Sequence, residues 1–152
     1  MSGKSAVKVR PLTRADRPDW DRLWEAYLAF YETSRPGEIF DTYFERLLGD
    51  DPQDFNALVA EVDGKLVGLT HYLFHRHGWR VENVCYLQDL YANPDIRGVG
   101  VGRALIEGVY AAADAAGCPS VYWLTQDFNT HARKLYDRIG RLSPFVKYER
   151  AD

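Results

Sequence analysis

Three glycines, Gly98, Gly100 and Gly102, alternate between an apolar strand pattern and the start of an amphipathic helix pattern. Glycine lets the backbone pass close to a ligand, and the free N–H groups at the start of a helix attract anions. A phosphate or pyrophosphate is therefore the ligand that this segment predicts. A bare tight turn is the alternative that the glycines alone leave open.

Two common nucleotide motifs do not fit this loop. A P-loop requires Lys and then Ser or Thr after its last glycine, whereas Arg103 and Ala104 follow Gly102. A dinucleotide fingerprint that starts at Gly98 or Gly100 requires a further glycine at position 103 or 105, and neither position has one. Neither motif is therefore present.

The pattern Arg97-x-x-Gly100-x-Gly102 after a strand resembles the acetyl-coenzyme-A signature of the GNAT superfamily, the GCN-related N-acetyltransferases. Residues 87–94 resemble the strand that precedes this signature in the family. The order of elements also resembles that of the family over nearly the whole chain. The resemblance implies the fold and the acetyl-CoA-dependent activity of that family.

A second motif of the family has the spacing of Asn129-x-x-Ala132-x-x-x-Tyr136-x-x-x-Gly140. Residues 86–150 are most similar to the polyamine, diamine and thialysine acetyltransferases and to the yeast histone/polyamine acetyltransferase branch. The segments that carry this finer resemblance are Gln88–Tyr91, Ser120–Trp123, Asn129 and Pro144–Tyr148.

The resemblance implies that acetyl-CoA binds along the strand, the glycine loop and the following helix. The backbone of Leu90, Tyr91 and Ala92 would pair with the pantetheine amides as if the cofactor extended the sheet. Arg97 would add a positive charge, and Asn129 would contact the cofactor arm, although a plain helix N-cap also explains Asn129. The N–H groups expected around the pyrophosphate are those of Gly98, Val99, Gly100, Val101, Gly102 and Arg103.

Tyr136 matches the general acid of the family. Acyl transfer to an amine requires a proton for the departing thiolate, and a phenol with a pKa of about 10 still holds its proton at neutral pH. Tyr136 also continues an apolar helix stripe with Ala132, Leu135 and Ile139, so a core tyrosine is the alternative.

The group that removes the amine proton is less well defined by the sequence. The polyamine acetyltransferases have a glutamate where this chain has Gln88, and an amide cannot take a proton. Asp89 is a tentative replacement, either for proton removal or for binding the amine. A chain of water molecules to bulk solvent is the other explanation.

An aromatic helix face formed by Trp20, Trp24, Tyr27 and Tyr31 either lines an acceptor pocket or packs over the sheet. Acidic residues nearby would attract a cationic amine or would simply be solvated. These residues are Glu25, Glu32, Glu38 and Asp41.

The histidines and cysteines do not predict a metal site. His75 and His77 have the spacing of side chains on one face of a strand, but no third ligand is evident, so a surface loop explains them better. His71 and His131 complete the set of four histidines. Cys85 and Cys118 are expected to be reduced and inert.

Strand and helix patterns alternate along the chain and predict one α/β domain over residues 1–152, a GNAT fold with a central mixed, mostly antiparallel sheet flanked by about four helices. An Asp63–Gly64 pair predicts a tight hairpin. The expected strands cover residues 7–10, 57–62, 66–74, 84–91, 121–124 and 145–148. The expected helices run from an Asp16 N-cap to Tyr31 and over residues 40–48, 101–116 and 129–139.

The composition excludes several classes of protein. A chain of 152 residues with 46% hydrophobic residues can bury one core, and a net charge of −3 argues against nucleic-acid binding. The sequence has no export signal and no apolar run long enough to span a bilayer, so we expect a cytoplasmic protein without a membrane partner. The apolar segment Phe145–Tyr148 predicts a homodimer, because an unpaired edge strand favours association.

The sequence thus predicts an N-acetyltransferase that moves an acetyl group from acetyl-CoA, without a metal, directly to the primary amine of a small molecule. Polyamines, diamines and lysine-like amino acids are the leading acceptors. A protein or peptide amine is the first alternative. The second is a non-catalytic acyl-CoA-binding regulatory module.

Overall fold

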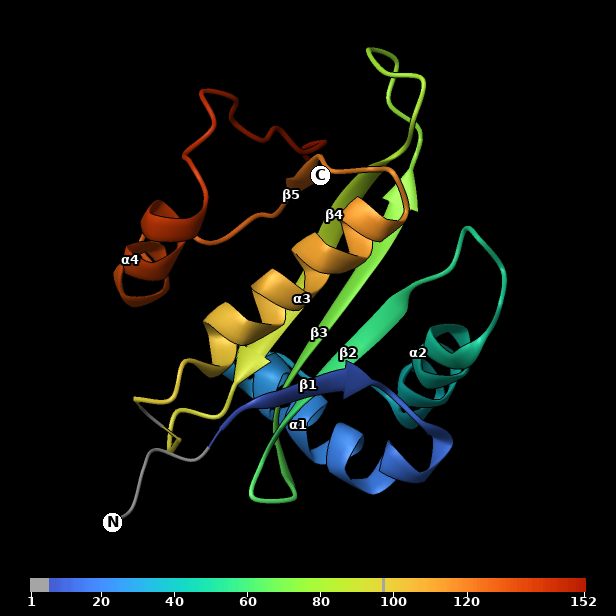
Figure 1. The fold of residues 1–152 in the computed structure, drawn as a ribbon, viewed down its shortest axis with the longest axis vertical. Helices are drawn as coiled ribbons and strands as arrows, with labels where there is room; N and C mark the ends of the chain where they lie inside the picture. The colour runs from blue at the N-terminus through green and yellow to red at the C-terminus, as the bar shows by residue number, and fades with distance from the viewer. Residues whose placement is uncertain (1–5, 97) are drawn as a thin grey trace.

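The computed structural model describes residues 6–96 and 98–152 and places five strands in one mixed sheet (Figure 1). The strands follow one another in the order β1-β2-β3-β4-β5, with antiparallel pairing from β1 to β4 and parallel pairing between β4 and β5. This is the mixed, mostly antiparallel sheet that the sequence predicts. The strands are β1 Lys8–Pro11, β2 Asn56–Val62, β3 Lys65–His75, β4 Val84–Ala92 and β5 Val121–Tyr122.

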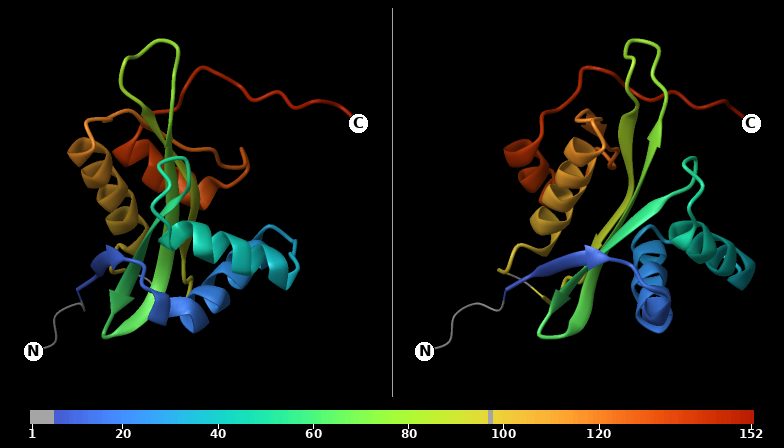
Figure 2. Two further views of the ribbon diagram at one scale, coloured as in Figure 1. Left: turned by 90° about the vertical axis from the view of Figure 1, so that its right-hand side faces the viewer. Right: turned by 45° about the vertical axis from the view of Figure 1, so that its right-hand side comes forward.

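Helices cover both faces of the sheet (Figure 2). The first two α-helices pack on one face and the last two lie on the other, which makes three layers. The helices are a short 3-10 helix η1 Arg14–Asp16, then α1 Arg17–Phe30, α2 Gly37–Leu48, α3 Val101–Ala115 and α4 Thr130–Ile139. Among the described residues, no helix has both the length and the apolar character needed to cross a membrane.

The start of α1 is fixed by one buried carboxylate. Asp16 is the N-cap residue and Pro18 stands in the first turn, as the sequence predicts. Asp16 Oδ2 accepts hydrogen bonds from the Thr13 backbone N–H at 2.8 Å and from Arg10 Nη1 at 2.8 Å. Because both partners precede the helix, α1 is anchored to the end of β1.

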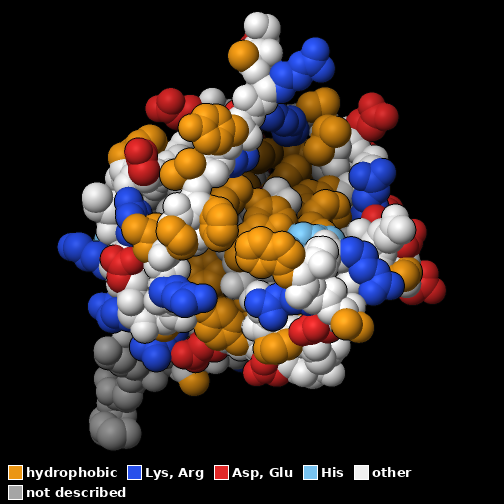
Figure 3. Space-filling model, turned by 90° about the horizontal axis from the view of Figure 1, so that it is seen from above, with side chains coloured by type: hydrophobic (Ala, Val, Ile, Leu, Met, Phe, Trp, Pro, Cys, Tyr) orange, Lys and Arg blue, Asp and Glu red, His pale blue; other side chains and the backbone are white. Residues whose placement is uncertain are grey.

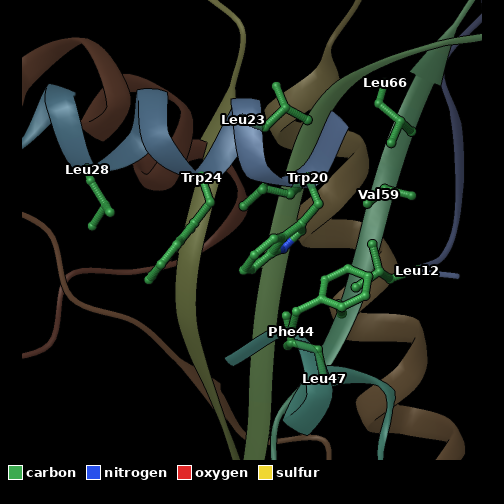
Figure 4. Packing of buried hydrophobic residues seen from close by; sticks show 11 residues of the cluster. Leu12, Trp20, Leu23, Trp24, Leu28, Phe44, Leu47, Val59 and Leu66 are labelled. Carbon is green, nitrogen blue, oxygen red and sulfur yellow. The ribbon is translucent and has the colours of Figure 1, made fainter. Parts of the chain in front are cut away.

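The core between the sheet and the first two helices is rich in aromatic rings (Figure 4). Trp20 on α1 is fully buried, stacks on Trp24 at a centroid distance of 5.4 Å and meets Phe44 of α2 edge-on at 5.2 Å. Offset and edge-on contacts of this kind stabilise a core beyond the area they bury. Trp20 therefore packs over the sheet, which is one of the two roles expected of this face, whereas Trp24 packs in the core and also borders a cavity described below.

The hairpin between β2 and β3 turns where the sequence predicts. Asp63 and Gly64 both have positive φ, at 52° and 78°, as a two-residue hairpin turn requires. Val62 pairs with Lys65 across this turn, so the turn sets the register of the sheet at that end.

β4 and β5 separate soon after they meet. Their ladder contains only the pairs Cys85↔Val121 and Tyr86↔Tyr122. β5 is thus shorter than the predicted strand over 121–124, because the chain turns away from β4 toward α4 (Figure 1). Along the rest of β4, no described strand pairs with the edge that faces β5.

The predicted strand over 145–148 is not present. Residues 141–152 have no regular secondary structure and extend away from the sheet (Figure 2). Phe145, Val146 and Tyr148 are all exposed. The prediction was wrong for this chain taken alone, because alternating apolar residues form a strand only where another strand lies beside them.

Candidate active site

A β-bulge on β4 turns Asp89 toward α1 and α2. Asp89 pairs with His71 of β3 and Leu87 pairs with Tyr72, which leaves Gln88 as an extra residue between them. One extra residue changes the face on which the following side chains point. Leu87 consequently packs in the core under α3, while Asp89 faces α2.

The Asp89 carboxylate is buried and held by side chains from two other elements. Its Oδ2 atom lies 2.8 Å from His71 Nδ1 on β3 and accepts a hydrogen bond of 2.5 Å from the Tyr43 hydroxyl on α2. The Thr70 hydroxyl also donates to the Asp89 backbone carbonyl at 2.8 Å. Side chain and backbone of Asp89 are therefore both fixed, at 6% exposure.

Two opposing influences set the protonation state of Asp89. Burial disfavours the charge and acts to raise the pKa, whereas the hydrogen bond and charge interaction with His71 and the hydrogen bonds from Tyr43 and Tyr27 act to lower it. Together these interactions outweigh burial, so the pKa of Asp89 lies below its ordinary value. An ionised carboxylate of low pKa is a weak base, so it is better suited to bind an ammonium group than to remove its proton.

The second ring nitrogen of His71 accepts a hydrogen bond from the indole of Trp20. The Trp20 Nε1–H group donates a hydrogen bond of 3.0 Å to His71 Nε2, and both side chains are completely buried. The hydrogen bonds from Trp20 to His71 and from His71 to Asp89 therefore connect α1, β3 and β4 across the core.

A cavity of about 320 Å³ opens beside Asp89. Its size suits a small molecule. The molecular surface seen from above is hollowed near its centre, and hydrophobic side chains gather around the hollow (Figure 3). The residues that line the cavity are Trp24, Leu28, Arg35, Ile39, Thr42, Tyr43, Arg46, Phe55, Gln88 and Asp89.

Tyr136 on α4 is half-buried and packs edge-on against Trp123 at a centroid distance of 5.5 Å. Burial, together with the nearby Tyr31 hydroxyl, raises the pKa of Tyr136 to about 12, so the phenol holds its proton at neutral pH. No described residue forms a hydrogen bond with this hydroxyl. Tyr31, at the end of α1, also has a pKa raised by burial and by Asp89. Tyr31 thus lies within electrostatic reach of both Tyr136 and Asp89.

The glycine loop leads into α3 in a left-handed conformation. Gly98 and Gly100 have φ of 77° and 76°, which glycine adopts without strain. No side chain caps α3, and the hydrogen bond from Ala104 N–H to the Gly100 carbonyl is the first that closes a turn of the helix. The earlier N–H groups, those of Val101, Gly102 and Arg103, are therefore available to an anion.

The predicted cofactor site includes two arginines, Arg97 and Arg103. Arg97 lies outside the described residues. The Arg103 side chain forms an exposed ion pair with Glu107 at 2.8 Å, so its expected contribution is limited to the backbone N–H.

One edge of β4 has no described partner strand at Leu90, Tyr91 and Ala92. Their other edge pairs with β3, where Leu90 lies opposite Thr70 and Ala92 opposite Gly68. The unpaired edge offers backbone N–H and C=O groups to an extended ligand.

Asn129 stands at the N-cap position of α4, but its side chain does not cap the helix. Its Nδ2 atom donates to Thr125 Oγ1 at 3.2 Å instead. The plain N-cap explanation therefore does not account for this side chain.

The other residues weighed from the sequence lie away from Asp89. Among the described residues, no three His, Cys, Asp or Glu side chains are arranged to hold a metal ion. His75 ends β3 and bonds to Tyr122 at 2.7 Å, and His77 lies in the following loop. None of Glu25, Glu32, Glu38 and Asp41 lines the cavity, and Asp41 pairs with Arg17 at 2.7 Å.

Sequence reasoning missed His71 and Tyr43 as partners of Asp89. His71 lies between Leu69 and Leu73 in an apolar run, and that position was the available signal that it is buried. Tyr43 belongs to the apolar stripe of α2 and gave no such signal. Its hydroxyl reaches Asp89 only because α2 packs on the same face of the sheet as α1.

The sequence is similar to a known protein family and to individual members of it. Residues 20–140 match the family described as Acetyltransferase (GNAT) family. The chain is 37% identical over 145 residues to the D-amino-acid N-acetyltransferase HPA3 of Saccharomyces cerevisiae, which covers 95% of this chain and 90% of the relative. It is 36% identical over 145 residues to the thialysine N-epsilon-acetyltransferase of Mus musculus, covering 90% and 84%.

Solved structures agree with the fold. A ribosomal-protein-alanine N-acetyltransferase from Brucella melitensis biovar Abortus 2308 superimposes with a TM-score of 0.77 at 26% identity, covering 97% of this chain and all of the other. An aminoglycoside N-acetyltransferase, AAC(6')-Iy, in complex with CoA superimposes with a TM-score of 0.82 at 20% identity, covering 99% and 98%.

Proposed function

The chain belongs to the acetyltransferase (GNAT) family, and from this premise we propose that it transfers an acetyl group from acetyl-CoA to the primary amine of a small molecule by direct attack. The observation that carries the choice of acceptor is the buried, ionised Asp89 beside a cavity of about 320 Å³. A cavity of that size suits a free small molecule better than a folded protein surface.

The residues present fit acetyl-CoA as the co-substrate. The unpaired edge of β4 at Leu90–Ala92 is suited to the pantetheine amides, and the uncapped start of α3 after Gly100 is suited to the pyrophosphate. The Asn129 side chain, which does not cap α4, is available to the cofactor arm. Acetyl-CoA supplies an acyl group activated as a thioester.

Two proton movements accompany the transfer. The amine must lose a proton before it attacks, and the departing sulfur must gain one. Tyr136 is our candidate for the second, since its hydroxyl holds a proton and hydrogen-bonds to no described residue. Asp89 is our candidate for binding the ammonium form, and water carries the released proton to solvent because Gln88 cannot accept it.

Amino acids are the acceptors that we favour among small amines. The two relatives named above act on amino acids according to their names. Arg35 and Arg46 line the same cavity as Asp89, and within the described part of the chain neither forms an ion pair with an acid. One carboxylate and two guanidinium groups complement a molecule that carries both an ammonium and a carboxylate.

A thiol-release assay with acetyl-CoA and a panel of amines tests the proposal. Lysine and cadaverine form a matched pair, because cadaverine is lysine without the carboxylate. Turnover of lysine well above that of cadaverine supports the amino-acid acceptor, and equal turnover removes the role of the arginines. Release with peptide amines alone would favour a protein acceptor. Binding of acetyl-CoA without release for any amine would contradict catalysis.

We also propose a homodimer formed through the C-terminal segment, residues 141–152. Its large apolar side chains are exposed in a single chain, at 76% for Phe145 and 92% for Tyr148. Sedimentation equilibrium is expected to show a dimer that Phe145→Asp dissociates, whereas a wild-type monomer at all concentrations would contradict it. A cytoplasmic location is our working proposal, in keeping with the free, buried thiols of Cys85 and Cys118.

A further inference from the structure

Trp20, His71 and Asp89 form a line of three buried side chains that ends at the cavity. The distances are 3.0 Å from Trp20 Nε1 to His71 Nε2 and 2.8 Å from His71 Nδ1 to Asp89 Oδ2. Trp20 and His71 are completely buried, and Asp89 is 6% exposed and lines the cavity.

The chemistry of the indole decides which nitrogen of His71 carries the proton. An indole N–H only donates, so the His71 nitrogen that it faces must present a lone pair. The imidazole proton then stands on Nδ1 and is donated to Asp89. A second proton, on Nε2, would place two N–H donors against each other at 3.0 Å. The indole of Trp20 therefore opposes formation of an imidazolium next to Asp89.

We propose that Trp20 and His71 are positioning residues that keep His71 neutral, so that the charge of Asp89 stays uncompensated and attracts the acceptor ammonium. This inference rests on the proposed function of Asp89 as the amine-binding group. An imidazolium 2.8 Å away would cancel most of the field of the carboxylate, whereas a neutral donor leaves it in place. The hydrogen bonds from His71 and Tyr43 both fall on Oδ2, and Tyr27 also acts on the carboxylate as a neutral donor, so none of these three partners brings a positive charge to Asp89.

The tyrosines near Asp89 do not carry charge at neutral pH. Burial and the carboxylate itself raise the pKa values of Tyr43 from α2 and of Tyr27 and Tyr31 from α1. Burial also raises the pKa of Tyr86 on β4. These phenols stay protonated, so they add no charge beside Asp89. Arg35 and Arg46 line the same cavity from the segment before α2 and from α2 itself.

The variant Trp20→Phe tests the proposal, because it removes the N–H donor and keeps an aromatic ring. In this variant no N–H donor faces His71 Nε2, so that nitrogen can carry a proton. We expect the KM for the amine in Trp20→Phe, divided by that of the wild type, to rise about tenfold between pH 8 and pH 6, the scale of one charge-assisted contact. The KM for acetyl-CoA should not change. Taking the ratio cancels the pH dependence that belongs to the amine itself.

Two further variants separate this role from simple packing. In Trp20→Phe combined with His71→Asn, no imidazole can charge, so the ratio should become independent of pH. Trp79→Phe is the matched control, because Trp79 is 83% exposed in the loop after β3 and should leave the profile unchanged. A folded Trp20→Phe enzyme with a flat ratio overturns the proposal.

A direct measurement covers the case in which Trp20→Phe does not fold. Nitrogen-15 NMR of the wild-type protein should show His71 protonated on Nδ1 alone from pH 6 to pH 8, with the signal assigned by its loss in His71→Asn. A proton on Nε2 at any of these pH values overturns the proposal. This readout needs no turnover, so it remains decisive even if no amine is acetylated, an outcome that would instead contradict the proposed function.

Discussion

The two sides of the candidate active site differ in the groups that they offer to a ligand, backbone atoms on one side and side chains on the other. On the cofactor side, the groups offered are backbone atoms, along the edge of β4 and at the start of α3. On the acceptor side, the groups are side chains brought together from distant parts of the chain, with Tyr43 and Asp89 46 residues apart and Trp20 and His71 51 apart. Backbone groups are present in every chain of this fold, whereas side chains differ and can select among ligands.

This difference predicts how each side responds to substitution. On the cofactor side, a change should matter where it alters backbone conformation, since the side chains there contribute little. On the acceptor side, a change of one functional group should matter even when its shape is conserved, because the neighbouring group is left buried without a partner. Variants of Tyr136, Asp89 and Gly100 test these expectations in turn.

The largest effect is expected at Tyr136, the proposed proton donor. Tyr136→Phe removes the proton donor and keeps the ring against Trp123, so kcat should fall by about 100-fold or more, the range of general acid catalysis. The dissociation constant of acetyl-CoA, measured by calorimetry, should stay within about twofold. An unchanged kcat would return Tyr136 to the role of a core tyrosine.

Asp89→Asn should lower kcat/KM for the amine by about 10- to 100-fold, because it removes the charge and keeps the shape of the side chain. The KM for acetyl-CoA should not move, because the cofactor side does not use this group. Asp114→Asn, on the exposed part of α3, is the matched control and should behave as the wild type. An equal loss toward both substrates would mean that the two sides are not separable.

Gly100→Ala should act on the cofactor side alone. The residue has a φ of 76° and nothing within 4 Å of an added Cβ, so the cost is backbone strain of about 1–2 kcal/mol rather than a clash. Gly64→Ala is the matched control, since Gly64 has a φ of 78° in equally open surroundings. Both variants should lose similar stability in urea, but only Gly100→Ala should raise the KM for acetyl-CoA, by several-fold. A rise in both would show strain, not ligand contact.

The same difference explains what the sequence could and could not predict. Most helices and strands along the chain, the Asp63–Gly64 hairpin and the glycine turn before α3 depend on local patterns, and the structure places them as expected. The partners of Asp89 depend on which face of β4 it occupies, and the bulge at Gln88 decides that. Nothing in the alternation of residues 84–91 marks where the extra residue falls. A site made of long-range side-chain contacts therefore becomes visible only once α2 and β3 are in place.

The smallest expected effect concerns stability in acid and tests whether the acceptor side is already formed without ligand. Because the folded-state pKa of Asp89 lies below its ordinary value, the ionised group stabilises the fold at a pH above the unfolded value of about 3.9. That contribution is lost as the pH falls through the folded-state pKa. The free energy of unfolding should therefore decrease less steeply between pH 5 and pH 3 in Asp89→Asn than in the wild type, by urea titration. Parallel curves would mean that Asp89 gains its hydrogen bonds from His71 and Tyr43 only when the acceptor binds.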